Sequence, residues 1–249
     1  MSNTHPMYQG LPASVRARLE EWQKSLEATF GADLVAVLLT GGVARGDYKF
    51  GESDVNAIVI VRGAISFERL EAIASATQAA RYGARLSPSF IHESELAGAC
   101  DAFPLLYDEV KRWHIRVFGE DALAKVVVHD THRRLRIEQE LREAVFWLRR
   151  AVTDSLGARE AVGGSVLRKI RQVRRPLAAL LALRGVEHKA DVASVVAAAG
   201  AHYGVDVSSL AAPRERPEEA HAALTKLLGH AIEDVDRVST GPESLRREP

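Results

Sequence analysis

Glycines and acidic residues come together in one short stretch near residue 40. Gly41 and Gly42 follow an apolar run at residues 34–39, and Asp54 stands directly before a second apolar run, Val55–Val61. Glycines let the backbone approach phosphate oxygens closely, and free N–H groups beside them can hold those oxygens. A carboxylate that opens the next strand would face the phosphate through Mg²⁺, which prefers carboxylates together with substrate phosphates. The stretch therefore predicts a site for a phosphorylated ligand and a metal ion.

The same stretch resembles the signature of the nucleotidyltransferase superfamily. That signature has a Gly-Ser pair after one strand and Asp-x-Asp at the opening of a later strand. Ala-Arg-Gly-Asp at residues 44–47 and Ser-Asp at 53–54 are similar to the bacterial branch. That branch includes the aminoglycoside nucleotidyltransferases and small nucleotidyltransferases with a helical C-terminal domain.

The resemblance implies a chemistry and a set of residues. In the superfamily a pair of Mg²⁺ ions, held by three carboxylates, positions a nucleoside triphosphate whose nucleotidyl group passes to a hydroxyl. Mg²⁺ is thus the implied cofactor, and a nucleoside triphosphate is the implied substrate or ligand. Asp54 matches the first metal-binding aspartate and Asn56 the second catalytic position. The candidate nucleotide contacts are Gly41, Gly42, Arg45 and Ser53.

Three departures from the family pattern affect this site. Gly42 stands where the family has a serine, and Asn56 stands where it has the second aspartate. The amide oxygen of asparagine is neutral and is a weaker ligand for a hard cation than a carboxylate is. The third acid position falls on Ser89, unless Asp108 or Glu109 substitutes from a following strand. Magnesium binding should therefore be greatly weakened.

These residues favour one function and leave two alternatives. The favoured reading is a nucleotidyltransferase homologue that binds nucleotide with weak or no nucleotidyl transfer. The first alternative is an active Mg²⁺-dependent nucleotidyltransferase that acts on a hydroxyl of a small molecule or a protein. The second is a non-catalytic, antitoxin-like interaction protein. Arg216 and His221 have a spacing found in helical ribonuclease domains that partner small nucleotidyltransferases. The acceptor or protein partner stays unknown.

Hydrophobic periodicity predicts the elements that position this site. It indicates helices at residues 11–30 and 66–83, the second capped by Ser66, and buried strands at 34–39 and 55–61. Residues 85–92 read as an extended segment in which Pro88 marks a sheet edge or a bulge, and residues 93–99 read as a short helix. We expect a strand rather than a helix within residues 104–118.

The second half of the sequence has helical spacing and no clear strand. Helices are expected near residues 135–152, 166–184, 190–203 and 217–238. The predicted fold class is α+β: a small mixed sheet with flanking helices, as in nucleotidyltransferases, followed by an all-helical bundle. The expected domains are residues 1–128 and 129–240, with a tail at 241–249.

Composition excludes several classes of function. The chain has 249 residues, with 33 Lys and Arg against 33 Asp and Glu. This balance provides no bulk attraction to nucleic acid or to an anionic membrane. The single cysteine, Cys100, excludes an internal disulfide and reads as a small buried apolar residue. No apolar run approaches the length of a membrane span, and the N-terminus lacks a signal-peptide pattern, so we expect a cytoplasmic protein.

The sequence contains two other clusters that could form sites. The histidines His92, His114, His129 and His132 lack a convincing metal-ligand spacing. The second cluster is basic. On one helix it should spread over more than one face, as a solvated surface or as a cationic wall toward a triphosphate or an acidic partner. It comprises Arg168, Lys169, Arg171, Arg174 and Arg175.

Overall fold

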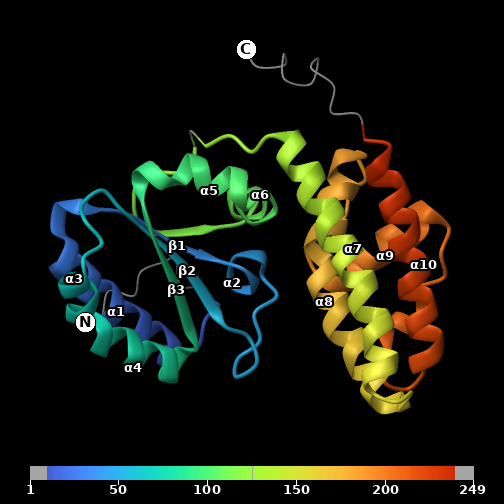
Figure 1. Cartoon of the computed structure of the whole chain (residues 1–249). Helices are drawn as coiled ribbons and strands as arrows, with labels where there is room; N and C mark the ends of the chain where they lie inside the picture. The colour runs from blue at the N-terminus through green and yellow to red at the C-terminus, as the bar shows by residue number, and fades with distance from the viewer. Residues whose placement is uncertain (1–9, 125, 239–249) are drawn as a thin grey trace. The chain divides into compact units, whose positions relative to one another are not determined.

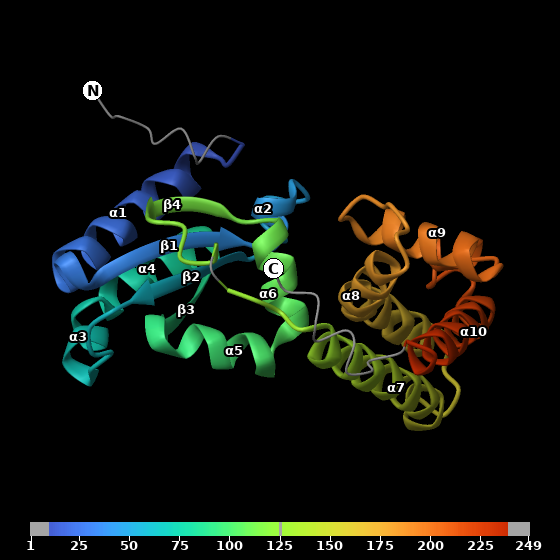
Figure 2. The same cartoon turned by 90° about the horizontal axis from the view of Figure 1, so that it is seen from above.

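The computed structural model describes residues 10–124 and 126–238, which form two compact units. The first unit comprises the chain up to Ala102 together with Glu109–Val127. The second comprises Phe103–Asp108 together with the chain from Val128. The first contains a sheet with helices and the second contains helices (Figures 1 and 2). The predicted α+β fold class is confirmed, while the predicted tail at 241–249 lies outside the described residues.

A four-stranded mixed sheet organises the first unit, here called the α/β unit. The strand order is β3-β2-β1-β4, with β1 antiparallel to both β2 and β4, and β2 parallel to β3. The edge position that Pro88 predicted for its segment is confirmed, because an edge strand tolerates a missing N–H donor. The bounds are Leu34–Thr40 for β1, Val55–Val61 for β2, Leu86–His92 for β3 and Ile115–Gly119 for β4.

Helices α1 to α5 of the α/β unit follow the sequence prediction with one break. The helix predicted at 66–83 ends and restarts at Ile73, while Ser66 accepts the N–H of Arg69 at 3.4 Å as its N-cap. The bounds are α1 Ala13–Phe30, α2 Gly42–Arg45, α3 Phe67–Ala72, α4 Ala74–Ala84 and α5 Leu96–Ala102. A further helix, α6 Pro104–Arg112, begins in the second unit and ends in the first.

The prediction of a strand within residues 104–118 was wrong for its first half. Pro104 begins helix α6, a position where proline is favoured because its missing N–H has no helical partner to lose. Leu105 and Glu109 are buried at a four-residue step, which is helical spacing. The strand begins only at Ile115. Asp108 and Glu109 therefore lie on a helix and not on a strand.

The two faces of the sheet are covered by different helices. Alternate side chains such as Val37 and Val59 share a core with Trp22 and Leu26 of α1. The opposite face carries buried residues such as Ile60 and lies under α5 and α6 (Figure 1). Alternation along β2 puts exposed Asn56 at the end of this second face, where the apolar side chains stop.

The second unit, here called the helical unit, confirms the predicted helices of the C-terminal half. Helix α8 begins earlier than predicted and continues through Pro176. Its core contains fully buried side chains such as Leu148, Leu177 and Leu224. No helix of the described residues is long and apolar enough to cross a membrane. The bounds are α7 Asp130–Asp154, α8 Arg159–Leu183, α9 Val192–Tyr203 and α10 Pro217–Asp236.

Candidate functional site

Gly41 forms the turn between β1 and α2. Its backbone has φ 66° and ψ −141°, a region that L side chains rarely adopt. A Cβ atom there would lie 2.8 Å from Nδ2 of Asn56. The turn and the packing of Asn56 therefore both require glycine at this position. The structure thus brings together two of the predicted site residues.

Asn56 lies in a polar row that crosses three strands. It is paired with Thr40 on β1 and with Ser87 on β3. Its side chain is exposed and makes no hydrogen bond to the other described residues. Ser89 pairs with Ile58, two residues farther along β2. The row therefore offers two hydroxyl groups and one amide, and no carboxylate.

Asp54, the residue before β2, is paired with Arg85. Oδ1 of Asp54 accepts from Nε of Arg85 at 3.0 Å and lies 2.9 Å from Nη2. Arg85 ends α4 in the left-handed region, with φ 52°, and its carbonyl accepts the N–H of Val55 at 3.0 Å. The backbone thus fixes both ends of this ion pair. About half of each side chain, 50% for Arg85 and 55% for Asp54, is exposed to solvent.

Tyr48 belongs to the same neighbourhood. Burial raises the pKa of its phenol, and the positive charge of Arg85 opposes that rise. The guanidinium of Arg85 therefore lies close enough to act on Tyr48 as well as on Asp54. Arg85 thus places a guanidinium beside Asp54, at the position where the family resemblance implies a metal ion.

Arg45, a candidate nucleotide contact, is held by two carboxylates. Its guanidinium pairs with Glu109 at 2.5 Å and with Asp47 at 3.3 Å. Glu109 is only 7% exposed, so this pair ties α2 to α6 across the sheet end. Asp108, the other proposed substitute for the third acid, pairs with Arg133 at 2.8 Å. Both acidic residues are thus engaged in ion pairs.

The glycine at position 42 is explained by Asp47. A Cβ atom on Gly42 would lie 2.9 Å from Oδ1 of Asp47, whose N–H donates to the Gly42 carbonyl at 2.9 Å. A serine here would push away the carboxylate that binds Arg45. The absence of a side chain at position 42 therefore leaves room for the Asp47 carboxylate that pairs with Arg45.

Ser53 stabilises the turn that leads into Asp54. Its hydroxyl accepts the N–H of Lys49 at 3.0 Å, and its own N–H donates to the Lys49 carbonyl at 2.9 Å. This turn places Asp54 at the head of β2. Ser53 therefore stabilises the backbone that leads into Asp54.

The residues at this site do not fit a pair of Mg²⁺ ions. Asp54 supplies one carboxylate, already bound to a guanidinium, and Asn56 supplies a neutral amide. Mg²⁺ in such sites is held by carboxylates together with substrate phosphates. Within the described ranges, no group of three or more His, Cys, Asp or Glu is arranged to hold a metal ion.

Arg85 is the residue that sequence reasoning missed. Parallel pairing of Val55 with Leu86 puts their preceding residues, 54 and 85, side by side. The signal was therefore present in the sequence, but reading it required the register between β2 and β3. Hydrophobic periodicity identifies strands and does not give their register.

Arg216 and His221, whose spacing resembles that of helical ribonuclease domains, form contacts within the helical unit. Nη2 of Arg216 donates to the Ser208 carbonyl at 3.1 Å. Nε2 of His221 lies 3.1 Å from the Leu148 carbonyl oxygen. The first contact links the start of α10 to the segment before it, and the second links α10 to α7. Both side chains therefore have a structural role in the helical unit.

Among solved structures, the chain is similar over most of its length to an adenyltransferase. That protein is spectinomycin adenyltransferase from Enterococcus faecialis, crystallised with ATP and spectinomycin, with a TM-score of 0.52 and 12% sequence identity. The match covers 89% of this chain and 99% of that one. This chain has a nucleotidyltransferase-like fold. At 12% identity the similarity concerns the fold alone. No protein-family model and no curated protein sequence matches the chain.

Proposed function

We propose that this nucleotidyltransferase-like chain binds a nucleoside triphosphate and transfers its nucleotidyl group weakly or not at all. The observation that carries the proposal is the ion pair of Asp54 with Arg85, beside Asn56. The first family aspartate is neutralised, and the second is replaced by an amide. The elements around the nucleotide-binding turn are nevertheless intact.

Charge explains why transfer is disfavoured. Two divalent cations next to one carboxylate would also be repelled by the guanidinium of Arg85. Metal-assisted transfer needs the ions to stabilise charge on both the attacking and the leaving oxygens. A single carboxylate that is already paired with Arg85 would not hold two such ions, so transfer would be slow or absent.

Binding has two sources of support in the α/β unit. The turn at Gly41 and Gly42 has no side chain to separate its backbone from a phosphate. Arg85 supplies a fixed cation that is half-exposed. Guanidinium groups form paired hydrogen bonds with phosphate oxygens. Binding that uses Arg85 would not need Mg²⁺.

A pyrophosphate-release assay tests the loss of transfer. The full chain is incubated with Mg²⁺ and ATP or GTP, with and without spectinomycin as a hydroxyl acceptor. We expect no pyrophosphate above background, and no difference between the native chain and Asp54→Ala. Release that Asp54→Ala abolishes would overturn the proposal and establish an active Mg²⁺-dependent nucleotidyltransferase.

A further inference from the structure

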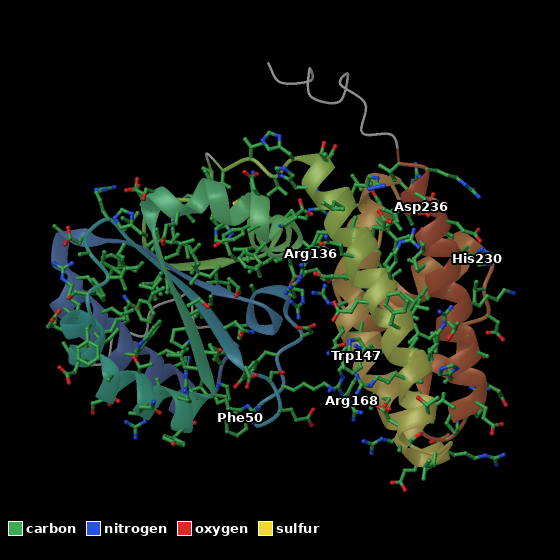
Figure 3. All side chains as sticks on the ribbon, in the orientation of Figure 1. Phe50, Arg136, Trp147, Arg168, His230 and Asp236 are labelled. Carbon is green, nitrogen blue, oxygen red and sulfur yellow. The ribbon has the colours of Figure 1, made fainter. Side chains whose placement is uncertain are left out.

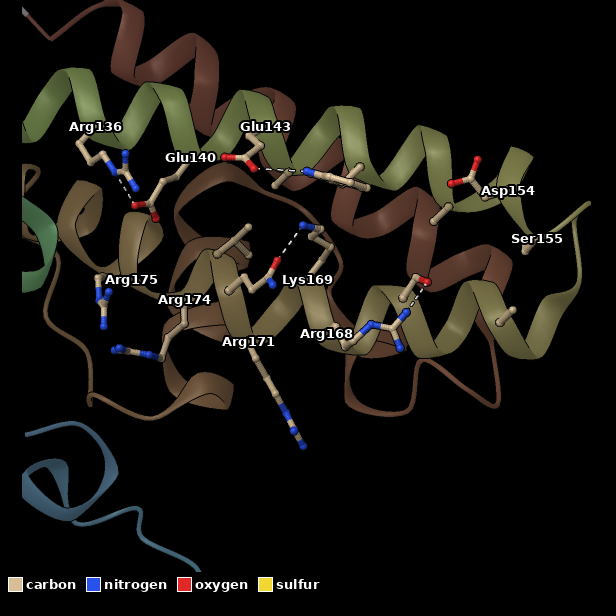
Figure 4. Close-up of a pocket in the computed structure, with 17 residues that line it drawn as sticks. Arg136, Glu140, Glu143, Asp154, Ser155, Arg168, Lys169, Arg171, Arg174 and Arg175 are labelled. Carbon is tan, nitrogen blue, oxygen red and sulfur yellow. Dashed lines mark hydrogen bonds and ion pairs between the residues drawn. The ribbon is translucent and has the colours of Figure 1, made fainter. Parts of the chain in front are cut away.

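Helices α7 and α8 of the helical unit enclose a groove of about 1000 Å³. Its lining comes from these two helices and from Ser155, which follows α7 (Figure 4). Small-molecule sites in proteins occupy roughly 300–1,000 Å³, so the groove has room for such a ligand. It lies within one unit and includes none of the residues discussed above for nucleotide binding.

Helical periodicity builds the two walls of the groove. Ala144, Trp147 and Ala151 follow one another at three- and four-residue steps and form an apolar stripe on α7. On α8, Arg168 and Arg175 are spaced by two helical turns. Figure 3 shows Arg136, Trp147 and Arg168 along one side of the unit, whereas His230 and Asp236 lie on the other. The five residues of the basic cluster on α8 all belong to the lining of this groove.

Two of the three acidic residues of the groove form ion pairs. Glu140 pairs with Arg136 at 2.7 Å, and Asp154 pairs with Arg150 at 2.9 Å. Glu143 accepts from the neutral Nε1 of Trp147 at 3.3 Å, and its negative charge acts on Lys169 of α8. With six basic and three acidic residues, the lining still has an excess of positive charge, which disfavours a ligand cation.

Three basic residues of α8, in contrast, form no ion pair with the described residues. Arg168 donates to the Ser165 hydroxyl at 2.9 Å, and Lys169 donates to Oε1 of Gln172 at 2.7 Å. Arg171 has no hydrogen bond or ion pair with the described residues, and its side chain extends away from α8 (Figure 4). Burial lowers the pKa of Lys169, which shows that its charge is partly removed from water. An anion would compensate these charges.

Trp147 adds an apolar surface beside the cations. Its side chain is 44% exposed. Nζ of Lys169 lies 5.4 Å from its ring centroid, so the indole orients this ammonium at the groove. An exposed indole next to alanines can also pack against a ring. The groove thus combines a positive wall with a wall for an apolar group.

We propose that this groove binds an anionic small molecule that carries a ring-sized apolar group. The anion would contact Arg168, Lys169 and Arg171, and the ring would pack on Trp147. The proposal is independent of nucleotide binding by the α/β unit, because it uses residues of the helical unit alone. The same charge pattern disfavours a polycationic ligand.

Three matched probes separate charge from ring. Phenyl phosphate has both a ring and an anion, inorganic phosphate has the anion alone, and benzylamine has the ring with a positive charge. Each is titrated into the full chain while tryptophan fluorescence is recorded. We expect a saturable change with phenyl phosphate, with a dissociation constant on the order of millimolar. Phosphate should bind more weakly, and benzylamine should produce no saturable change.

Charge-reversal variants locate the response. Arg168→Glu combined with Arg171→Glu should weaken phenyl phosphate binding at least about tenfold. Both side chains are exposed, so the fold should tolerate the change. Arg149→Glu is the matched control, an exposed α7 arginine outside the groove lining. Trp147→Phe should remove the fluorescence response.

Several outcomes would overturn the proposal. One is that the double variant and Arg149→Glu bind phenyl phosphate equally well. Another is that benzylamine binds as tightly as phenyl phosphate does. A third is that phenyl phosphate gives no saturable response. Arg85→Gly in the α/β unit should leave the response unchanged. A failure of ATP binding, which tests the function proposed above, would not affect this result.

Discussion

Arg85 contacts Oδ1 of Asp54 through two nitrogens, at 3.0 Å from Nε and 2.9 Å from Nη2. The pair joins the residue before β2 to the residue before β3. A guanidinium therefore takes the place beside Asp54 that the family resemblance implies for a metal ion.

Restoring the missing acid should expose this competition. Asn56→Asp alone should give little Mg²⁺ dependence, because Arg85 still binds Asp54. Asn56→Asp combined with Arg85→Gly should make ATP binding tighter in Mg²⁺ than in chelator, by about tenfold. Glycine is chosen because it adopts the positive φ of position 85 without strain. A strong Mg²⁺ effect in Asn56→Asp alone would show that Arg85 does not compete.

Two helical glycines should respond oppositely to alanine. A Cβ on Gly163 of α8 would lie 2.5 Å from the Pro213 carbonyl oxygen, whereas one on Gly229 of α10 meets nothing within 4 Å. Gly163→Ala should destabilise the protein by about 1–3 kcal/mol through overpacking. Gly229→Ala should stabilise it by about 0.5–1 kcal/mol through helix propensity. Urea unfolding followed by circular dichroism measures both, and shifts of the same sign would contradict the packing of α8.

Cys100 should react slowly with alkylating reagents. Burial raises the pKa of its thiol to about 11. Because the thiolate is the reactive form, the alkylation rate of the folded protein should keep rising between pH 8 and pH 10. Urea should abolish this protection. A rate that levels off near pH 9 in the folded protein would show a thiol of ordinary pKa.

Asp191 should give helix α9 a pH-dependent cap. Its carboxylate accepts the Ser194 hydroxyl at 2.7 Å and the Ser194 N–H at 2.9 Å, and these bonds lower its pKa below the ordinary 3.8. The stabilisation is therefore full above that value and is lost as the pH falls through the folded-state pKa. Asp191→Ala should cost about 1 kcal/mol at pH 7 and less below pH 3.8.

A matched variant checks the origin of the effect. Asn caps helices nearly as well as Asp and does not titrate. Asp191→Asn should therefore stay close to native stability at pH 7. Urea unfolding at both pH values gives the comparison. An unchanged difference between the native chain and Asp191→Ala at low pH would contradict a charged cap.

Sequence reasoning predicted the elements better than their relationships. The run Val55–Val61 was predicted with its observed bounds, because a strand buried on both faces reads as a continuous apolar segment. The segment from Pro104 was misjudged, since short apolar patterns fit either a strand or a helix. Pairs distant in sequence, such as Arg45 with Glu109, depend on tertiary packing and were not predictable.

The site itself was predicted in part. Gly41 and Asn56 lie together, yet the reason why Gly42 is not serine became visible only through Asp47. Local sequence cannot show that a carboxylate occupies the space of a missing side chain. The role of Arg85 likewise depends on strand register.

Isothermal titration calorimetry with ATP tests whether Arg85, without a metal ion, holds the nucleotide. The native chain, Arg85→Gly and the control Arg81→Ala, an exposed arginine of α4, are titrated in Mg²⁺ and in EDTA. The native chain and Arg81→Ala should bind ATP equally in both buffers, and Arg85→Gly should bind it at least about tenfold more weakly. Binding that appears only with Mg²⁺ and survives Arg85→Gly, or no binding at all, would contradict the proposed role of Arg85.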